Sequence, residues 1–257
     1  MISLGRSWRV CLRHLYMWRQ HAGASVAGNV AEPLLYLLIL GFGMGEMMDE
    51  RALPAGMNYR LFYGSGLIAS VAMMSASFEN LFGAFTRMMG QRTYEAMIAT
   101  PISLAEVLVG DALYAATKAS IASLAVPAVL LVVGEPVSIW ILLGLPATII
   151  LAFFFGSAAL LVMAHSPDYG WFNYYITLVL TPMFLFSGVF FPLEVFGTYG
   201  EIARFVPLSV GVEVQRSLVL GQMPPLQPII LCFTLLPGLS WLFLRLAHRK
   251  LQRRLIG

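Results

Sequence analysis

Three charged side chains interrupt long apolar runs of this sequence, and their chemistry needs an explanation. Glu32, Glu79 and Lys118 each stand alone in such a run, toward the end nearest a basic segment. An ionised group is costly in lipid, so such residues mark transport pathways unless they reach the headgroups or pair with another charge. We predict that Glu79 and Glu32 line a pathway and its gate; headgroup contact or pairing is the alternative.

Catalytic chemistry finds little support. The four histidines fall at or beyond the ends of the apolar runs; they are His14, His21, His165 and His248. Residues 165–168 contain Pro167 and fit a turn better than a nucleophile site, because a triad needs its members brought together. Cys11 and Cys232 are far apart and indicate neither a metal site nor a disulfide framework. We predict no catalytic residue and no metal, which leaves an intramembrane enzyme as the most distant alternative.

The elements that must position these residues are transmembrane helices. Of the 257 residues, 59% are hydrophobic and 11% are charged, whereas a soluble domain has about a quarter of its residues charged. Lipid must therefore be the solvent for much of the chain. We predict an all-α polytopic membrane protein, with residues 1–257 forming a single domain.

Six apolar runs are each long enough to cross the hydrocarbon layer, which takes about 20 helical residues. The alternation of polar and apolar residues that is typical of barrel strands is absent from the sequence. An even number of spans puts both termini on the same side. The predicted spans are 22–45, 61–86, 107–134, 136–164, 169–193 and 224–246.

The distribution of lysine and arginine decides the orientation, because cytoplasmic loops carry an excess of both. Twelve of the sixteen basic residues fall on the side of the two termini. The opposite loops hold Arg51, Arg60, Arg204 and Arg216, interspersed with acidic residues. Both termini are therefore predicted to face the cytoplasm.

Residues 1–21 form a basic amphipathic segment. On a helix, Leu4, Trp8, Cys11, Leu15 and Trp18 line one face, and Arg6, Arg9 and Arg13 line another. Such a helix lies in the membrane interface with its arginines among anionic headgroups. Its predicted anchors are Arg6, Trp8, Arg9, Arg13 and Trp18. A plain basic tail that only fixes the topology is the alternative. The segment lacks the apolar core of a signal peptide, which argues against that interpretation.

Residues 91–100 of the loop after the second span lack glycine and proline and predict a short cytoplasmic helix. Pro101 ends it, because its ring cannot continue a helix and also restricts Thr100. Ser103 and Glu106 then form a capping box that opens the third span. The short helix has the shape to enter a groove of a partner; a solvated linker is the alternative.

The opposite face carries a second structured connection, residues 194–222, with short amphipathic stretches at 199–206 and 209–220 separated by Pro207. Both are too short and too charged to span. The preceding Ser187-Gly188 and Phe191-Pro192 provide a break at which the fifth span turns back, which membranes tolerate only where protein or a wet cavity covers the backbone. We predict outer short helices that lie flat or re-enter. The aromatic residues 169–175 fit an interfacial belt, and stacking on sugar rings is the alternative.

Several motifs together resemble a known family. They are Glu32-Pro33-Leu34-Leu35-Tyr36, Ser77-Phe78-Glu79, Gly90-Gln91-Arg92-Thr93-Tyr94-Glu95-Ala96-Met97, Thr181-Pro182-Met183 and Ser187-Gly188-Val189-Phe190-Phe191-Pro192. With the order of predicted elements, they make the chain similar to the ABC-2 type transporter permeases. The likeness extends over nearly the full chain and is nearest to the nodulation protein J branch, which exports lipo-oligosaccharides with a separate ATPase.

The resemblance implies half of a transporter in the bacterial inner membrane. The expected partners are a second copy in a homodimer, a cytoplasmic ABC ATPase and membrane lipid, with no nucleic acid. ATP and Mg²⁺ would bind in the ATPase, and no cofactor is expected in this chain, which has no Gly-x-x-x-x-Gly-Lys-Ser/Thr loop. The substrate would be an amphiphile such as a lipo-oligosaccharide or lipid-linked glycan; a hydrophobic drug or another lipid is the alternative. The predicted ATPase-coupling residues are Arg92, Thr93, Tyr94, Glu95 and Met97.

Overall fold

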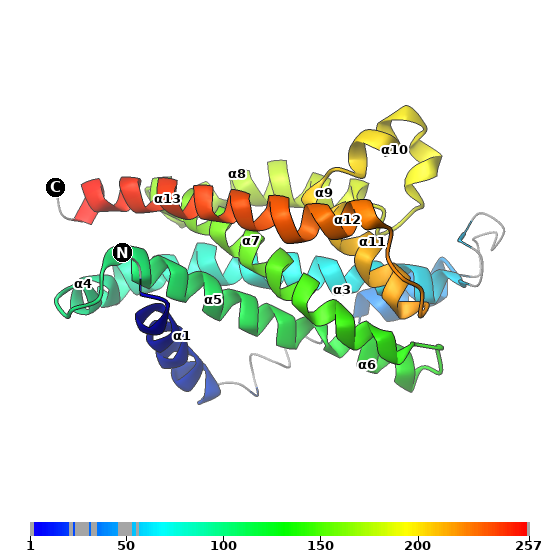
Figure 1. Ribbon diagram of the computed structural model, residues 1–257, viewed down its shortest axis with the longest axis horizontal. Helices are drawn as coiled ribbons and strands as arrows, with labels where there is room; N and C mark the ends of the chain where they lie inside the picture. Colours follow the sequence, from blue (N-terminus) through cyan, green and yellow to red (C-terminus); the bar gives the residue numbers. More distant parts are fainter. Residues whose placement is uncertain are drawn as a thin grey trace.

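The computed structural model describes residues 3–20, 23, 31, 35–45, 53–54 and 57–255, and every regular element within this part of the chain is a helix. Figure 1 shows a long bundle in which the beginning of α1 (Leu4–Arg19), the short helix α4 (Thr93–Ile98) and the end of α13 (Leu236–Leu255) lie at one end. We call this the α4 end. The opposite end carries α10 (Thr198–Ala203) and the connection that follows α6 (Ala125–Val132).

Four helices of the described chain are long and apolar enough to cross a membrane. They correspond to the second, third, fourth and sixth predicted spans, so a multi-pass helical membrane protein is confirmed. The sixth helix runs well past the predicted end at 246, because its basic turns continue as regular helix to Leu255. The bounds of the four long helices are Tyr59–Gly90, Leu104–Val132, Ile139–His165 and Leu226–Arg254.

The two other predicted spans have different outcomes. Nearly half of 22–45 lies outside the described residues, Glu32 among them, and Leu37–Phe42 forms a π-helical segment, η1. The fifth predicted span, 169–193, is helical only as far as Phe186. Its end is early because the Ser187 hydroxyl donates to the Met183 carbonyl and Gly188 has a φ of 76°, a left-handed conformation that no α-helix continues. The count of six spans stays a prediction.

The segments of this shorter fifth helix follow one another without a gap. They are η6 (Tyr169–Trp171), α8 (Phe172–Tyr175), η7 (Ile176–Leu180) and α9 (Thr181–Phe186). Two of the four long helices contain similar π-helical segments. A π-helical segment, η9 (Leu231–Leu235), joins α12 (Leu226–Ile230) to α13, and two others, η3 (Glu79–Gly83) and η4 (Thr86–Gly90), extend α3 (Tyr59–Phe78).

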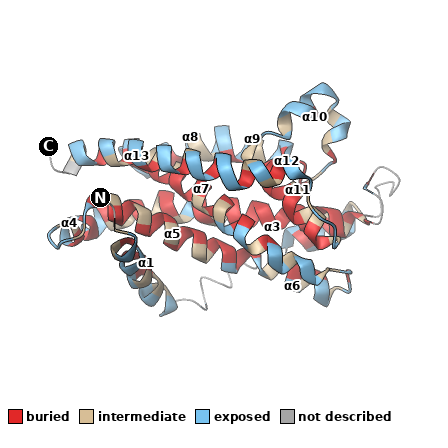
Figure 2. Cartoon of the chain, viewed as in Figure 1, coloured by how far each residue is buried: buried red, intermediate tan, exposed pale blue. Residues whose placement is uncertain are grey.

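The core lies where α3, α5 (Leu104–Ser123) and α7 (Leu145–His165) meet, and Figure 2 shows these helices as the most buried. A 3₁₀ segment, η5 (Ile139–Gly144), leads into α7, which packs against α13, α5 and α3. Part of the contact among α3, α5 and α7 consists of small side chains, which let helices approach closely in lipid, where apolar burial alone gives no drive to associate. These are Ala72, Ala76, Ala115, Ala116, Ala119 and Ala152.

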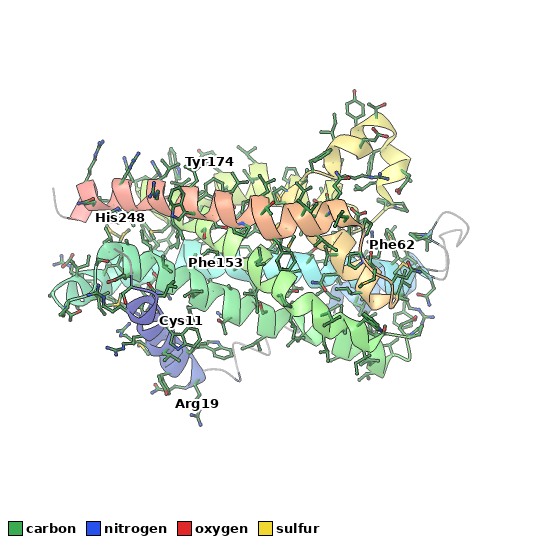
Figure 3. All side chains as sticks on the ribbon, viewed as in Figure 1. Cys11, Arg19, Phe62, Phe153, Tyr174 and His248 are labelled. Atoms are coloured by element: carbon green, nitrogen blue, oxygen red, sulfur yellow. The ribbon has the colours of Figure 1, made fainter. Side chains whose placement is uncertain are left out.

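The two outer amphipathic stretches behave differently. In and after α10, Ile202 and Phe205 are exposed, whereas Val210 and Val214 of α11 (Pro207–Val219) are buried in the core that contains α3. Arg216 fixes α11 in place. Its guanidinium donates to the Gly188 carbonyl at 2.8 Å and stacks 3.7 Å from the centre of the Phe62 ring, at the end of the molecule where Figure 3 labels Phe62.

Candidate functional site

The predicted helix 91–100 is shorter in the structure. Arg92 has a φ of 49°, in the left-handed region, so α4 begins only at Thr93 and ends at Ile98. The Thr100 hydroxyl and amide both bond to the Met97 carbonyl and close the last turn. A left-handed residue before the helix sets α4 at an angle to the end of η4.

The five predicted coupling residues divide between two faces of α4. Thr93, Tyr94 and Met97 are buried against the bundle, whereas Arg92 and Glu95 are exposed. Only the second group is accessible to another protein. The buried group instead connects α4 to the long helices.

The boundary between α4 and α5 is the one that the sequence predicts. The Ser103 hydroxyl accepts from the Glu106 amide at 3.4 Å, and the Glu106 carboxylate accepts from the Ser103 amide at 2.9 Å. This confirms the capping box and explains why the helix begins at Leu104, three residues before the predicted start at 107.

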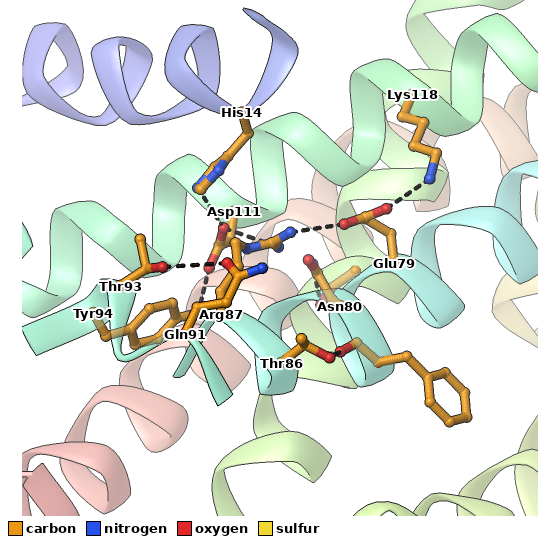
Figure 4. A network of polar contacts seen from close by, with 12 residues as sticks. His14, Glu79, Asn80, Thr86, Arg87, Gln91, Thr93, Tyr94, Asp111 and Lys118 are labelled. Carbon is orange, nitrogen blue, oxygen red and sulfur yellow. Dashed lines mark hydrogen bonds and ion pairs between the residues drawn. The ribbon is translucent and has the colours of Figure 1, made fainter. Parts of the chain in front are cut away.

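A fully buried carboxylate, Asp111 of α5, forms the centre of a polar network (Figure 4). Tyr94 of α4 donates its hydroxyl to Asp111 Oδ2. Nη2 of Arg87 lies 3.1 Å from Asp111 Oδ1, and Nε2 of His14 lies 3.0 Å from the same oxygen. Burial, and then the charge of Asp111, raise the pKa of Tyr94 well above its usual range, so its hydroxyl stays a donor.

The network continues through Glu79 along the long helix Tyr59–Gly90. Nη1 of Arg87 lies 2.9 Å from Glu79 Oε1, and Nζ of Lys118 lies 2.7 Å from Glu79 Oε2. Two carboxylates thus face two cationic side chains, which removes the need for a counter-ion in a poorly hydrated place. Glu79 and Lys118, two of the isolated charges in the apolar runs, therefore pair with each other.

The backbone leaves room for this arrangement at Gly83. A Cβ at this position would collide with the Glu79 carboxylate and come 3.2 Å from Nη1 of Arg87. Glu79, Gly83 and Arg87 recur every four residues along η3 and η4, so the two charged side chains meet over the glycine. A side chain here would push them apart.

The helix α1 reaches the network because it packs closely on α5. A Cβ on Gly110 would lie 2.6 Å from Val10 and 2.9 Å from the Ser7 carbonyl, so the glycine permits the crossing. Arg6 donates to Glu106 at 3.0 Å and to the Pro101 carbonyl at 2.8 Å. Arg6, predicted to lie among headgroups, therefore has protein partners.

The other predicted anchors of α1 have varied positions. Trp8, Arg9 and Arg13 are exposed, and Trp18 is half-buried. Cys11, predicted to share the apolar interfacial face, is fully buried against the protein. Contact of the exposed residues with headgroups stays a prediction.

Sequence reasoning missed the centre of the network. Asp111 lies near the start of the third predicted span, 107–134, but it was not singled out among the charged residues of the apolar runs. His14 was set aside as lying outside the spans, yet it follows Val10 and Cys11 at helical spacing, on the face that α1 buries. The signal available in the sequence was a stripe of uncharged residues on α1, away from the arginine face, that includes polar side chains such as His14. Such a stripe indicates a helix face that packs on protein.

A groove lies midway along the bundle, between α3 and the segments η7 and α9. Its volume is about 440 Å³, and its walls combine hydroxyl groups with apolar side chains. The Ser70 hydroxyl donates to the Gly66 carbonyl at 3.0 Å, whereas the buried hydroxyl of Ser75 has no hydrogen-bond partner among the described residues. The lining residues are Tyr36, Leu67, Ser70, Val71, Met74, Ser75, Phe78, Ile176, Thr181, Phe184 and Leu185.

Residues 7–220 match the family described as "ABC-2 type transporter", a range that includes most of α1 and all of α4, α5 and α11. The chain belongs to the ABC-2 type transporter family. Its resemblance to that family is thereby confirmed, and it is a membrane subunit of an ABC transporter.

Similar proteins of this ABC-2 group carry the name nodulation protein J. The one from Rhizobium leguminosarum bv. viciae is 38% identical over 220 residues, which cover 85% of this chain and 84% of that protein. The one from Rhizobium meliloti (strain 1021) is 36% identical over 219 residues, covering 84% and 82%. The one from Azorhizobium caulinodans is 32% identical over 221 residues, covering 85% and 86%.

Proposed function

We propose that this ABC-2 subunit is the permease of an ATP-driven exporter in the bacterial inner membrane, and that it moves an amphiphilic lipo-oligosaccharide out of the cytoplasm or inner leaflet. Two copies form the pathway, and a separate ATPase, which holds ATP and Mg²⁺, docks on the α4 end. The relatives named nodulation protein J support this substrate class through their likeness to the chain.

The observation that carries the proposal is the two-faced character of α4. Its exposed Arg92 and Glu95 offer a polar surface to a partner, while Tyr94 binds the bundle through Asp111. An ATPase drives transport only through a contact that changes with its nucleotide state and biases the membrane helices. The buried network supplies such a connection from α4 to α1, α3 and α5.

The charge distribution supports a cytoplasmic α4 end. Arg87 of η4, Arg92 before α4 and the basic residues at the end of α13 gather there, whereas Arg60 and Arg204 at the opposite end are each paired with an acid, at 3.0 Å from Glu135 and 2.8 Å from Glu194. An excess of lysine and arginine is the feature that marks the cytoplasmic side.

The groove supports an amphiphile as substrate. Ser75 and Thr181 offer hydroxyls that hydrogen-bond to a sugar, beside Leu67 and Phe184, which fit an acyl chain. Tyr36 of the first span lines it as well, and exposed apolar side chains of η1 and α9 flank it. A second copy that packs on this face by two-fold symmetry would close the groove into a shared pathway.

Reconstitution with the partner ATPase tests the proposal. We expect an acylated chitooligosaccharide to stimulate ATP hydrolysis, and the deacylated sugar to fail. Ser75→Ala should weaken stimulation by the glycan, whereas Ser70→Ala is the matched control because that hydroxyl already bonds to Gly66. Stimulation by hydrophobic drugs or plain lipids, without response to the glycan, would instead favour the second candidate, a drug or lipid exporter, for which the apolar part of the groove is the supporting observation.

A further inference from the structure

A second cavity, distinct from the groove, opens at the α4 end between the end of α7 and the last turns of α13. Its volume is about 540 Å³. The α7 side contributes His165, Ser166 and Pro167, and Figure 3 labels His248 on the same stretch of α13. The α13 side contributes Leu246, Arg249, Lys250, Arg253 and Arg254.

The charge of this cavity has one sign. Four cationic side chains line it, and no aspartate or glutamate does. Within the described chain, none of Arg249, Lys250 and Arg253 forms an ion pair. Arg254 is fixed by a hydrogen bond of 2.8 Å to the Ser166 carbonyl. Like charges at this spacing repel one another, so an anion in the cavity would stabilise it.

An apolar surface leads directly into the cavity. Leu242, Leu246, Arg249 and Arg253 follow one another at helical spacing and share a face of α13. Leu242 and Leu246 are 44% and 38% exposed. One turn away, the Arg245 guanidinium stacks 3.4 Å from the centre of the exposed Trp241 ring, an arrangement typical of the level of lipid headgroups.

We propose that this cavity binds the phosphate of an anionic phospholipid from the adjoining leaflet, with the acyl chains lying on the Leu242 and Leu246 face. An apolar face that ends in unpaired cations matches a molecule with two tails and one negative headgroup. A soluble anion has no acyl chains to pack on the apolar face. The site is separate from the groove and from the Asp111 network, so it goes beyond the proposed export function.

The test measures selectivity for phosphatidylglycerol over phosphatidylcholine. The full chain, without any ATPase, is placed in phosphatidylcholine bilayers that contain a trace of either spin-labelled lipid, and the motionally restricted fraction gives relative association constants. We expect a preference for phosphatidylglycerol. The triple variant R249Q/K250Q/R253Q should reduce it on the order of tenfold or more, because each basic side chain adds to the attraction for an anionic headgroup.

A relocated charge provides the matched control. Gln252 is exposed and does not line the cavity, so R253Q/Q252R keeps the net charge of α13 while it removes one cavity cation. We expect this variant to lose as much selectivity as R253Q alone. Retention of full selectivity would mean that only the diffuse positive field attracts lipid, and would overturn the site.

Two further outcomes would also contradict the proposal. If millimolar inorganic phosphate displaces the restricted phosphatidylglycerol at constant ionic strength, the cavity is a site for free anions. If the chain alone shows no preference and the triple variant instead loses ATPase binding, the basic surface is a docking site for protein. Thermal unfolding of each variant checks that the helices remain packed.

Discussion

The hydroxyl of Tyr94 donates a hydrogen bond to the carboxylate of Asp111, seventeen residues further along the chain, and both side chains are fully buried. The bond joins a short helix outside the membrane to one of the long helices. Asp111 also contacts His14 of α1 and Arg87 of η4. A displacement of α4 would therefore disturb the contacts of Asp111 with α1 and with the extension of α3.

Tyr94→Phe should therefore separate α4 from the network while leaving its packing. We expect a loss of about 1.5–3 kcal/mol in unfolding free energy, the range for a hydrogen bond to a charged group. A double-mutant cycle with Asp111→Asn should give a coupling energy of about 0.5–3 kcal/mol. Additive effects, measured by thermal or denaturant unfolding in detergent, would mean that the two residues act independently.

Charge reversal on the exposed face of α4 should break communication with the ATPase. Arg92→Glu or Glu95→Arg is expected to abolish substrate-stimulated ATP hydrolysis with normal expression and insertion, because a like-charge contact costs several kcal/mol. Glu201→Arg, on the exposed surface of α10, is the control and should leave the stimulation intact. Normal transport by the α4 variants would identify α4 as a passive linker.

Variants of Glu79 distinguish a role in the transport pathway from a role limited to its ion pairs with Arg87 and Lys118. Glu79→Ala leaves Arg87 and Lys118 without a shared partner, and loss of one side of such a buried pair costs about 3–5 kcal/mol. Glu79→Ala/Lys118→Ala restores the balance of charge. A pathway role predicts that transport stays low in the double variant although stability recovers. Transport that recovers together with the melting temperature would mean that Glu79 serves only the ion pairs.

Gly83→Ala should disturb the same pairs through space alone. The added methyl collides with the Glu79 carboxylate, and overpacking of this kind costs about 1–3 kcal/mol. Gly90→Ala is the matched control within the same helix, since a Cβ there meets only the Thr86 methyl, at 3.7 Å. Equal melting temperatures for the two variants would contradict the close approach.

Topology is tested by cysteine labelling in intact cells with an impermeant reagent. Cysteines placed at Glu50 and Glu201 should react from outside, and one at Glu95 should react only after lysis. The native thiols give little background: both are buried, and burial raises the pKa of Cys11 to about 11, which leaves little thiolate. Labelling at position 95 alone in intact cells would mean that the chain has the opposite orientation in the membrane.

The long helices and their boundaries could largely be predicted, because apolar length and local rules determine them. Four runs form helices long and apolar enough to cross a membrane, and the Ser103–Glu106 box marked the start of α5. Where prediction failed, the backbone departed from a local rule at one residue. Arg92 adopts a left-handed conformation without being a glycine, and Gly188 ends the fifth helix within an apolar run.

The candidate site was predicted only in part. Thr93, Tyr94 and Met97 are buried, so they cannot be told from core residues by their types, and their role in ATPase coupling stays a prediction. His14 and Asp111 are almost a hundred residues apart, and a single sequence carries no measure of which distant polar groups meet. Lys118 and Glu79 were each recognised as unusual, and their pairing was open until the packing of α3 on α5 brought them together.

The attachment of α1 also sets an order of assembly. The backbone amide of Ser3 donates to the Glu106 carboxylate at 2.9 Å, beside the ion pair of Arg6 with the same group. During synthesis α1 therefore precedes its binding site, which is made roughly 100 residues later, about 5–20 s at ordinary rates of synthesis. Until then α1 is a free basic helix, and a bulky tag fused directly before Ser3 would compete with its final docking.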